Sequence, residues 1–159
     1  MMILKNINSV LIVCTGNICR SPMGEGVLKH KLNQAGLSYI QIHSAGTSGW
    51  DRCKPISLAI QACSEMGVDI SSLRSNPITE KMIQSSDVIL AMEKNHLSEM
   101  IKLYHAPSQK LFLFGDFHPD LPGMEIEDPY GLPISYYRNI LKLICQCSDG
   151  FIGLLKKTT

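Results

Sequence analysis

The chain has 159 residues, the length of one ordinary domain, and we expect a single domain over residues 1–159. Hydrophobic residues make up 45% of the sequence and charged residues 18%, which excludes a disordered or collagen-like chain. The formal net charge of +1 gives no electrostatic reason to expect nucleic acid as a partner.

The sequence also bears on the compartment. No apolar stretch approaches the roughly 20 residues that a membrane-spanning helix needs, so we expect no membrane insertion. The apolar run over residues 10–13 is too short for a secretory signal. We therefore expect a cytoplasmic protein whose six cysteines stay reduced. Four cysteines show no metal-ligand spacing and are predicted to lie in the core or at the surface: Cys53, Cys63, Cys145 and Cys147.

Strands and helices are predicted to alternate along the chain. Short apolar runs predict four strands, over residues 9–13, 39–43, 87–92 and 110–114. Apolar periodicity, with Pro or Gly at several ends, predicts helices over residues 22–35, 57–66, 79–85, 93–104 and 134–155. Gly150 and Gly153 are expected to bend or fray the last helix. The alternation predicts an α/β fold, with a four-stranded parallel sheet and helices on both faces.

The loop after the first strand is the first place to look for chemistry, because ligands of such sheets bind beyond the carboxyl ends of the strands. It reads Cys-Thr-Gly-Asn-Ile-Cys-Arg-Ser-Pro over residues 14–22. Gly16 and Asn17 allow the backbone to turn its N–H groups inward as an anion-binding nest. Arg20 offers a planar fork that fits two oxygen atoms of a phosphate.

Cys14 stands at the centre of this positive field, which favours its thiolate at neutral pH. Ser21 is placed to donate a hydrogen bond to the sulfur. A thiolate at the bottom of a phosphate-sized cup indicates nucleophilic attack on phosphorus. The residues alone also fit a plain strand–helix connection around a buried cysteine, the commonest state of a free thiol.

Attack on a phosphate ester expels an oxyanion, which leaves more easily when a carboxylic acid protonates it. The long Gly- and Pro-rich loop before the last helix contains several acids, and Pro129 would fix the position of Asp128. From the residues alone the choice stays open among five candidates: Asp128, Glu127, Glu125, Asp116 and Asp120.

Residues 13–22, Val-Cys-Thr-Gly-Asn-Ile-Cys-Arg-Ser-Pro, resemble the phosphate-binding signature of the low-molecular-weight protein tyrosine phosphatases. Further patterns match that family in the same order along nearly the whole chain. They are His-Ser-Ala-Gly-Thr over 43–47, Asp-x-Ile-x-x-Met over 87–92, and the pair Asp128-Pro129. The segment over 125–130 resembles bacterial members associated with exopolysaccharide export.

The resemblance implies a role for each matching residue. Cys14 would be the nucleophile, Arg20 would hold the phosphoryl group, and Asp128 would be the general acid and base. Asn17 and Ser21 would support the loop and the thiolate. The resemblance implies six further phosphate- or substrate-binding residues, the last two as aromatic pocket walls: Thr15, Gly16, Ile18, Cys19, Trp50 and Tyr130.

Two expectations concern the surroundings of the loop. His43 and Ser44 are expected to support it, with His43 bracing the loop by a hydrogen bond to Asn17. In the resembling family, a cysteine at the position of Cys19 can form a reversible disulfide with the nucleophile, which protects it from over-oxidation.

The resemblance implies hydrolysis of phosphotyrosine in proteins, without a cofactor or a metal. The expected partner is a phosphotyrosine-containing protein, for which the resemblance suggests a bacterial tyrosine kinase of capsule or exopolysaccharide export. The expected state is a monomer or weak dimer. One alternative is a protein arginine phosphatase, although relatives with that activity have a smaller, hydroxylated residue where this chain has Ile18. A thiol-dependent arsenate reductase is a weaker alternative, because residues 80–100 contain no cysteine for a relay. A non-catalytic anion-binding module is the third.

Overall fold

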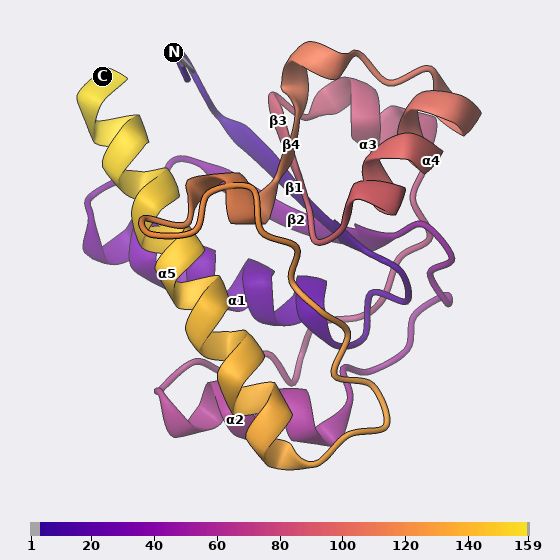
Figure 1. Ribbon diagram of the computed structural model, residues 1–159, viewed down its shortest axis with the longest axis vertical. Helices are drawn as coiled ribbons and strands as arrows, with labels where there is room; N and C mark the ends of the chain where they lie inside the picture. The colour runs from indigo at the N-terminus through magenta and orange to yellow at the C-terminus, as the bar shows by residue number, and fades with distance from the viewer. Residues whose placement is uncertain (1–3, 159) are drawn as a thin grey trace.

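The computed structural model describes residues 4–158 (Figure 1). Within them the strands are β1 (Ser9–Cys14), β2 (Gln41–Gly46), β3 (Val88–Ala91) and β4 (Leu111–Leu113). The α-helices are α1 (Arg20–Gln34), α2 (Ser57–Glu65), α3 (Glu80–Ser85), α4 (Lys94–Tyr104) and α5 (Ile134–Thr158). Two short 3₁₀ helices flank β4: η1 (Ser108–Lys110) and η2 (Phe114–Phe117).

The four strands form one parallel sheet in the order β2-β1-β3-β4. Side chains of β1 alternate between two cores because successive residues of a strand point to opposite faces. Val10 and Ile12 pack in the larger core with residues of α1, α2 and α5, whereas Leu11 and Val13 pack with residues of α3 and α4. The predicted four-stranded parallel sheet with helices on both faces is therefore confirmed (Figure 1).

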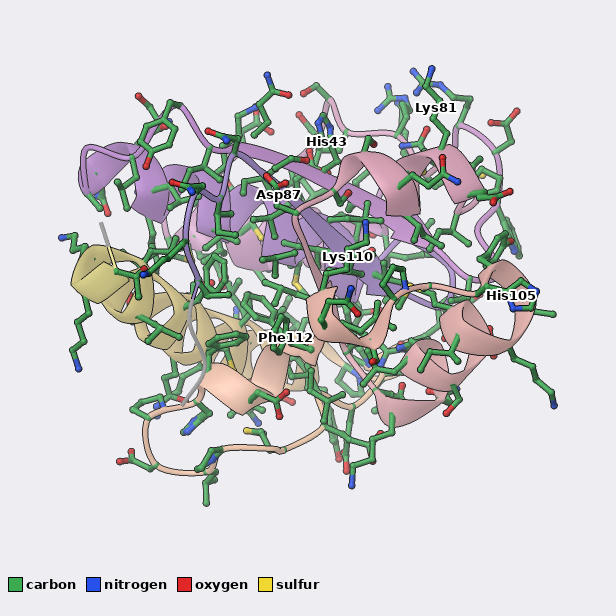
Figure 2. The ribbon with its side chains drawn as sticks, turned by 90° about the horizontal axis from the view of Figure 1, so that it is seen from above. His43, Lys81, Asp87, His105, Lys110 and Phe112 are labelled. Carbon is green, nitrogen blue, oxygen red and sulfur yellow. The ribbon has the colours of Figure 1, made fainter. Side chains whose placement is uncertain are left out.

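Two charged side chains, Asp87 and Lys110, form hydrogen bonds at the end of the sheet where the strands begin (Figure 2). Asp87 precedes β3, and its Oδ2 accepts hydrogen bonds from the backbone N–H groups of Asn8 (2.8 Å) and Ser9 (3.0 Å) at the start of β1. Lys110 precedes β4 and donates from Nζ to the carbonyl of Ser86 at 3.0 Å. The bonds from Asp87 therefore tie the start of β1 to the start of β3, with which it pairs.

The second strand differs from its prediction over 39–43, because β2 runs three residues further, to Gly46. Tyr39 lies in a turn with 55% of its surface exposed, so its β-propensity is not used. Ala45 and Gly46, which have low β-propensity, pair instead with Val13 and Cys14 of the central strand. Tertiary pairing therefore overrides local preference in this strand.

The last helix was expected to bend or fray at Gly150 and Gly153, and the expectation that it frays there is wrong. Helix α5 is continuous for 25 residues. A Cβ atom at position 150 would lie 1.8 Å from the carbonyl oxygen of Phe117, so Gly150 allows close packing of α5 against η2. Among residues 4–158, no helix is both long and apolar enough to cross a membrane.

Candidate active site

The predicted phosphate-binding loop connects β1 to α1, with Cys14 as the last residue of the strand and Arg20 as the first of the helix. The sulfur of Cys14 lies 3.0 Å from Oγ of Ser21 and accepts a hydrogen bond of 3.3 Å from the backbone N–H of Asn17. Donors aimed at the sulfur stabilise a thiolate, and they stabilise it again as a leaving group.

The backbone of this loop is an oxyanion cradle. Within residues 4–158, the N–H groups of Gly16, Ile18 and Cys19 donate to no other group of the protein, so they are available to ligand oxygens. They lie beside the N-terminus of α1, where the helix dipole also favours negative charge.

Asn17 holds the loop in shape. Its φ of 57° lies in the left-handed region that asparagine tolerates. Its side-chain Nδ2 donates to Oγ of Ser21 at 2.7 Å and to Oγ of Ser44 at 3.0 Å, and its Oδ1 accepts from the backbone N–H of Asn76 at 2.8 Å. One buried amide thus ties the loop to β2 and to the segment before α3.

The expected hydrogen bond from His43 to Asn17 is not formed, and this detail of the prediction is wrong. His43 is exposed on β2 (Figure 2), whereas the adjacent Ser44 is buried and makes the bond to Asn17. The reason is strand parity, because neighbouring side chains in a strand point to opposite faces. The supporting role predicted for Ser44 fits this placement.

Arg20 is buried, with only 1% of its surface exposed, and three groups hold its guanidinium in place. Its Nη1 donates to the carboxylate of Glu93 and, at 2.8 Å, to the carbonyl of Ile126. Its Nη2 lies 3.6 Å from Oδ2 of Asp128. The guanidinium therefore links the loop, the start of α4 and the loop that contains the predicted acid.

His96 holds the first part of the loop, at Thr15, whereas Arg20 lies at the end of the loop. Its Nδ1 accepts a hydrogen bond of 3.1 Å from the backbone N–H of Glu93, which leaves the proton of the neutral ring on Nε2. Nε2 lies 2.8 Å from Oγ1 of Thr15 and therefore donates to it. The first turn of α4 thus positions both Thr15, through His96, and Arg20, through Glu93.

Beside the phosphate-binding loop lies a cavity of about 160 Å³. Nine residues line it: Cys14, Thr15, Gly16, Ile18, Cys19, Arg20, Trp50, Asp128 and Tyr130. Trp50 and Tyr130, the two residues expected as aromatic walls, are 63% and 61% exposed and lie at the rim of the cavity. Asn17 and Ser21 lie behind the cradle as its supports.

Of the five acids left open by the residues alone, Asp128 alone lines this cavity. Two rivals have structural partners: Asp116 accepts from the backbone N–H of Leu113, and Glu125 accepts from that of Lys94. The Asp128 carboxylate is itself oriented, because Oδ1 accepts a 3.1 Å hydrogen bond from the N–H of Tyr130. Asp128 is therefore, of these five acids, the one that lines the same cavity as Cys14.

The other thiols differ from Cys14 in their surroundings. Burial raises the pKa of Cys19 to about 11, although its contact with the Tyr137 hydroxyl at 3.6 Å acts in the opposite direction. Burial raises the pKa of Cys63 and Cys147 to about 12. These three groups are neutral thiols at physiological pH. Within residues 4–158, no group of three or more His, Cys, Asp and Glu side chains is arranged to hold a metal ion.

Sequence reasoning missed three residues that position the cradle: Glu93, His96 and Asn76. A signal for the first two existed, since Glu93 and His96 open the helix that follows a buried strand. Using it required the knowledge that β3 lies beside β1, which places both loops at one edge. Asn76 contributes a backbone N–H, for which side-chain identity gives no signal.

Replacement of His96 by glutamine is expected to reduce the pH dependence of stability on the acid side. Burial first, and then the charge of Arg20, lowers the pKa of His96 below its ordinary 6.5, so the unfolded chain takes up a proton more readily than the folded protein. Its contribution to stability is therefore complete above about pH 6.5 and is lost as pH falls through the folded-state pKa. The measurement is the free energy of urea unfolding of the wild type and the variant at pH 7.5 and at pH 5.5.

At pH 7.5 the same variant is expected to lose about 0.5–1.5 kcal/mol of stability, because the backbone N–H of Glu93 loses the Nδ1 atom that accepts its hydrogen bond. His105→Asn is the control, since His105 is exposed at the C-terminal end of α4 in a left-handed conformation that asparagine tolerates. An unchanged pH dependence in His96→Gln would contradict the assignment of a buried neutral ring.

Taken together, these groups can bind a tetrahedral oxyanion, attack its central atom with sulfur, and protonate the group that leaves. A sequence model of the family described as "Low molecular weight phosphotyrosine protein phosphatase" matches residues 9–159. The protein-tyrosine-phosphatase Etp of Escherichia coli is 35% identical over 150 residues, which cover 94% of this chain and 96% of Etp.

Two further comparisons bear on the site. The crystal structure of the tyrosine phosphatase Wzb of Escherichia coli K30 with sulphate has a TM-score of 0.84 and 29% identity, and the match covers 94% of this chain and 99% of Wzb. A protein-arginine-phosphatase of Bacillus subtilis is 30% identical over 129 residues, which cover 81% of this chain and 84% of that protein.

Proposed function

Because the chain belongs to the low molecular weight phosphotyrosine protein phosphatase family, we propose that it hydrolyses phosphotyrosine in proteins through a cysteinyl phosphate on Cys14. The observation that supports this most directly is the convergence of the Cys14 sulfur, the Arg20 guanidinium and the Asp128 carboxyl group on one cavity. The reaction needs no cofactor, since these residues supply the nucleophile, the charge and the proton.

In the first step the thiolate of Cys14 attacks phosphorus, and the bond from phosphorus to the tyrosine oxygen breaks. Asp128 gives its proton to the departing phenolate, which leaves as a neutral phenol. The loop N–H groups and Arg20 stabilise the charge on the equatorial oxygens, as preorganised donors do without reorganising. The product of this step is a phosphorylated Cys14.

In the second step a water molecule attacks the phosphorus while the Asp128 carboxylate accepts its proton. The bond between sulfur and phosphorus breaks, inorganic phosphate is released, and the thiolate of Cys14 is restored. The hydroxyl of Ser21, 3.0 Å from the sulfur, stabilises the departing thiolate. Asp128 thus ends each turnover protonated, ready for the next.

The walls of the cavity favour an aryl ester. Trp50 and Tyr130 at the rim, with half-buried Ile18 in the loop, offer flat apolar surface to a phenyl ring held above the phosphate. The side chain of a phosphoserine is shorter, so its phosphate would not reach the loop at the bottom of the cavity while the peptide backbone stays outside. We therefore expect a clear preference for phosphotyrosine over phosphoserine peptides of the same sequence.

The arginine phosphatase similarity gives this proposal its sharpest test. The branched Ile18 side chain crowds a phosphorylated guanidinium, so we expect the wild-type kcat/KM to be higher for a phosphotyrosine peptide than for its phosphoarginine counterpart. Ile18→Thr should raise the ratio of phosphoarginine to phosphotyrosine kcat/KM by about 10-fold, because one or two carbon atoms in a pocket have effects of that size. Peptide assays by phosphate release measure it.

Ile101→Thr, an exposed isoleucine on α4, is the control for this substitution and should leave the ratio unchanged. Wild-type preference for phosphoarginine would replace the proposed substrate class while keeping the same nucleophile. Preference for phosphoserine would contradict the argument from the aromatic rim.

The biological setting is proposed on the sequence resemblance of residues 125–130. We expect the substrate to be a bacterial tyrosine kinase of capsule or exopolysaccharide export, acted on in the cytoplasm by a single-domain monomer or weak dimer. Loss of phosphotyrosine from such a kinase in cells that overproduce the wild-type enzyme, and not the Cys14→Ser variant, would support it. An unchanged kinase would contradict it.

A further inference from the structure

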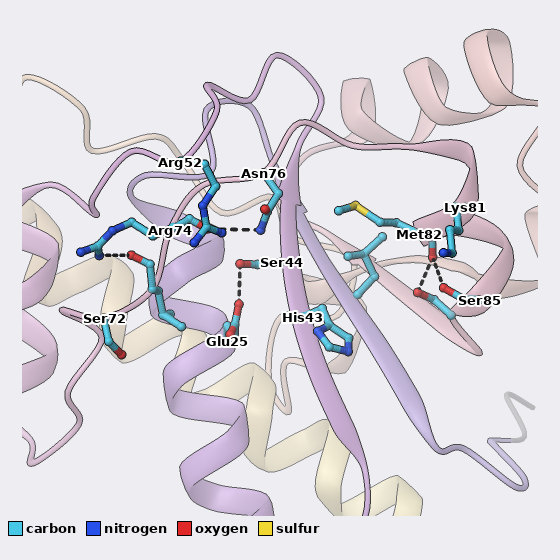
Figure 3. Close-up of a pocket in the computed structure, with 13 residues that line it drawn as sticks. Glu25, His43, Ser44, Arg52, Ser72, Arg74, Asn76, Lys81, Met82 and Ser85 are labelled. Atoms are coloured by element: carbon cyan, nitrogen blue, oxygen red, sulfur yellow. Dashed lines mark hydrogen bonds between the residues drawn. The ribbon is translucent and has the colours of Figure 1, made fainter.

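A second cavity, of about 430 Å³, lies behind the phosphate-binding loop (Figure 3). It is bounded by β2, by the first half of α1, by the segment over 72–76 and by α3. The residues that line it include no residue of the first cavity. Its volume is that of a small-molecule site and too small for a folded partner.

Three cationic side chains are among the residues that line this cavity. Arg52, Arg74 and Lys81 line the cavity, and within residues 4–158 none of the three forms an ion pair with a carboxylate. Arg74 donates from Nη1 to two carbonyls of its own segment. Figure 3 shows Arg52 and Arg74 at one side and Lys81 at the other. The cavity is thus built to receive negative charge.

Between these cations lies a single carboxylate. Glu25 of α1 accepts a hydrogen bond of 2.6 Å from Oγ of Ser44 at its Oε1, and burial raises its pKa (Figure 3). Ser72, Ser85 and Ser86 also line the cavity, and the hydroxyls of Ser85 and Ser86, which donate to the carbonyl of Met82, can still accept a hydrogen bond. A carboxylate repels an anion, so this part of the cavity suits the neutral, hydroxyl-bearing part of a ligand whose charge lies at the rim.

The wall of the cavity touches the catalytic loop. Ser44 and Asn76 line the cavity, and both also form hydrogen bonds with the side chain of Asn17. From Glu25 the hydrogen bonds continue through Ser44 at 2.6 Å and Asn17 at 3.0 Å to Ser21 at 2.7 Å, which contacts the Cys14 sulfur at 3.0 Å. A ligand that moves Ser44 or Asn76 would therefore change the surroundings of the nucleophile.

We propose that this cavity binds a hydroxylated organic phosphate of the size of a sugar phosphate, with its phosphate against Arg74, Arg52 or Lys81 and its hydroxyls on Glu25 and the serines. The guanidinium forks supply bidentate donors for the phosphate, and the carboxylate accepts from sugar hydroxyls. The occupied cavity alters turnover at Cys14 through Ser44 and Asn17.

Binding is tested on full-length Cys14→Ser protein, which cannot turn over the probe, by titrating the ¹⁵N-labelled protein with glucose 6-phosphate. We expect two sets of amide shifts, one at the loop and one around Ser44 and Asn76. The double variant Arg74→Gln/Lys81→Gln should weaken the second set about 10-fold or more and leave the first unchanged. Lys142→Gln/Lys157→Gln, at two exposed lysines on α5, is the charge-matched control.

Glu25→Gln and two simpler probes separate the two parts of the ligand. Glucose 6-phosphate should bind the cavity more tightly than inorganic phosphate or glucose alone, and Glu25→Gln should reduce that advantage without weakening inorganic phosphate. Shifts confined to the loop, or a second set that survives the double variant, would overturn the site. Equal affinity for inorganic phosphate would overturn the role of the hydroxyls. None of these outcomes depends on the proposed hydrolysis.

The link to the nucleophile is tested separately with wild-type enzyme. Its kcat and KM for an aryl phosphate are measured with and without added glucose 6-phosphate. Glucose 6-phosphate that competes with the substrate in the first cavity raises KM and leaves kcat unchanged. Glucose 6-phosphate bound in the second cavity should change kcat by about twofold or more. The double variant should abolish the change in kcat while keeping the competition. A pure rise in KM in wild type would overturn the link through Ser44 and Asn17.

Discussion

Cys14→Ser is expected to lower kcat for aryl phosphates by about 10⁴-fold or more while the protein still binds oxyanions. Serine places an oxygen where the sulfur lies, but its hydroxyl stays protonated in a cradle that has no base beside it, so no nucleophile forms. The binding of an oxyanion relies on the loop N–H groups and on Arg20, which the substitution leaves in place. Phosphate or tungstate affinity should change by less than about threefold, measured by calorimetry.

A covalent intermediate gives a second readout for the same residue. Wild-type enzyme quenched in acid during turnover of ³²P-labelled substrate should retain label on a peptide that contains Cys14, and the variant should retain none. Cys53→Ser is the matched control, because its thiol is half-buried and, within residues 4–158, its one hydrogen bond goes to the backbone carbonyl of Asp51 at 3.8 Å. Label on another cysteine, or activity of Cys14→Ser within tenfold of wild type, would contradict the assignment.

The parts of this site that the sequence predicts are those encoded by neighbours along the chain. A strand end, a glycine and an asparagine in the loop, and Arg-Ser-Pro at the helix start all lie within residues 14–22, so their geometry follows from local rules. Asp128 needed the family resemblance, because only the fold brings residues from the loop before α5 to the end of β1.

The remaining parts depend on facts that local patterns do not contain. Glu93 and His96 reach Arg20 and Thr15 because β3 lies next to β1, and the strand order follows from packing of the whole sheet. The choice between His43 and Ser44 depends on the register of β2, and a shift of one residue reverses which side chain faces Asn17. Gly150 was misread because its partner, the carbonyl of Phe117, is distant in sequence.

Asp128→Asn is expected to slow the hydrolysis of poor leaving groups far more than that of good ones. Asparagine keeps the shape and can still accept the N–H of Tyr130, but it cannot donate a proton to a departing oxyanion. Phenyl phosphate needs that proton, whereas a nitrophenolate is stable without it. General acid catalysis contributes about 10²–10⁴-fold, so the rate constant of the phosphorylation step should fall by that factor for phenyl phosphate and by much less for p-nitrophenyl phosphate.

Because Asp128 also acts as base in the second step, single-turnover kinetics must separate the two. A burst of p-nitrophenol followed by slow turnover is expected in the variant, since phosphoenzyme forms readily and water attack is left without its base. Glu127→Gln is the control, an exposed acid beside Asp128 that does not line the cavity. Equal slowing of both substrates in the burst phase would mean that Asp128 acts through the position of Arg20, 3.6 Å away, and donates no proton.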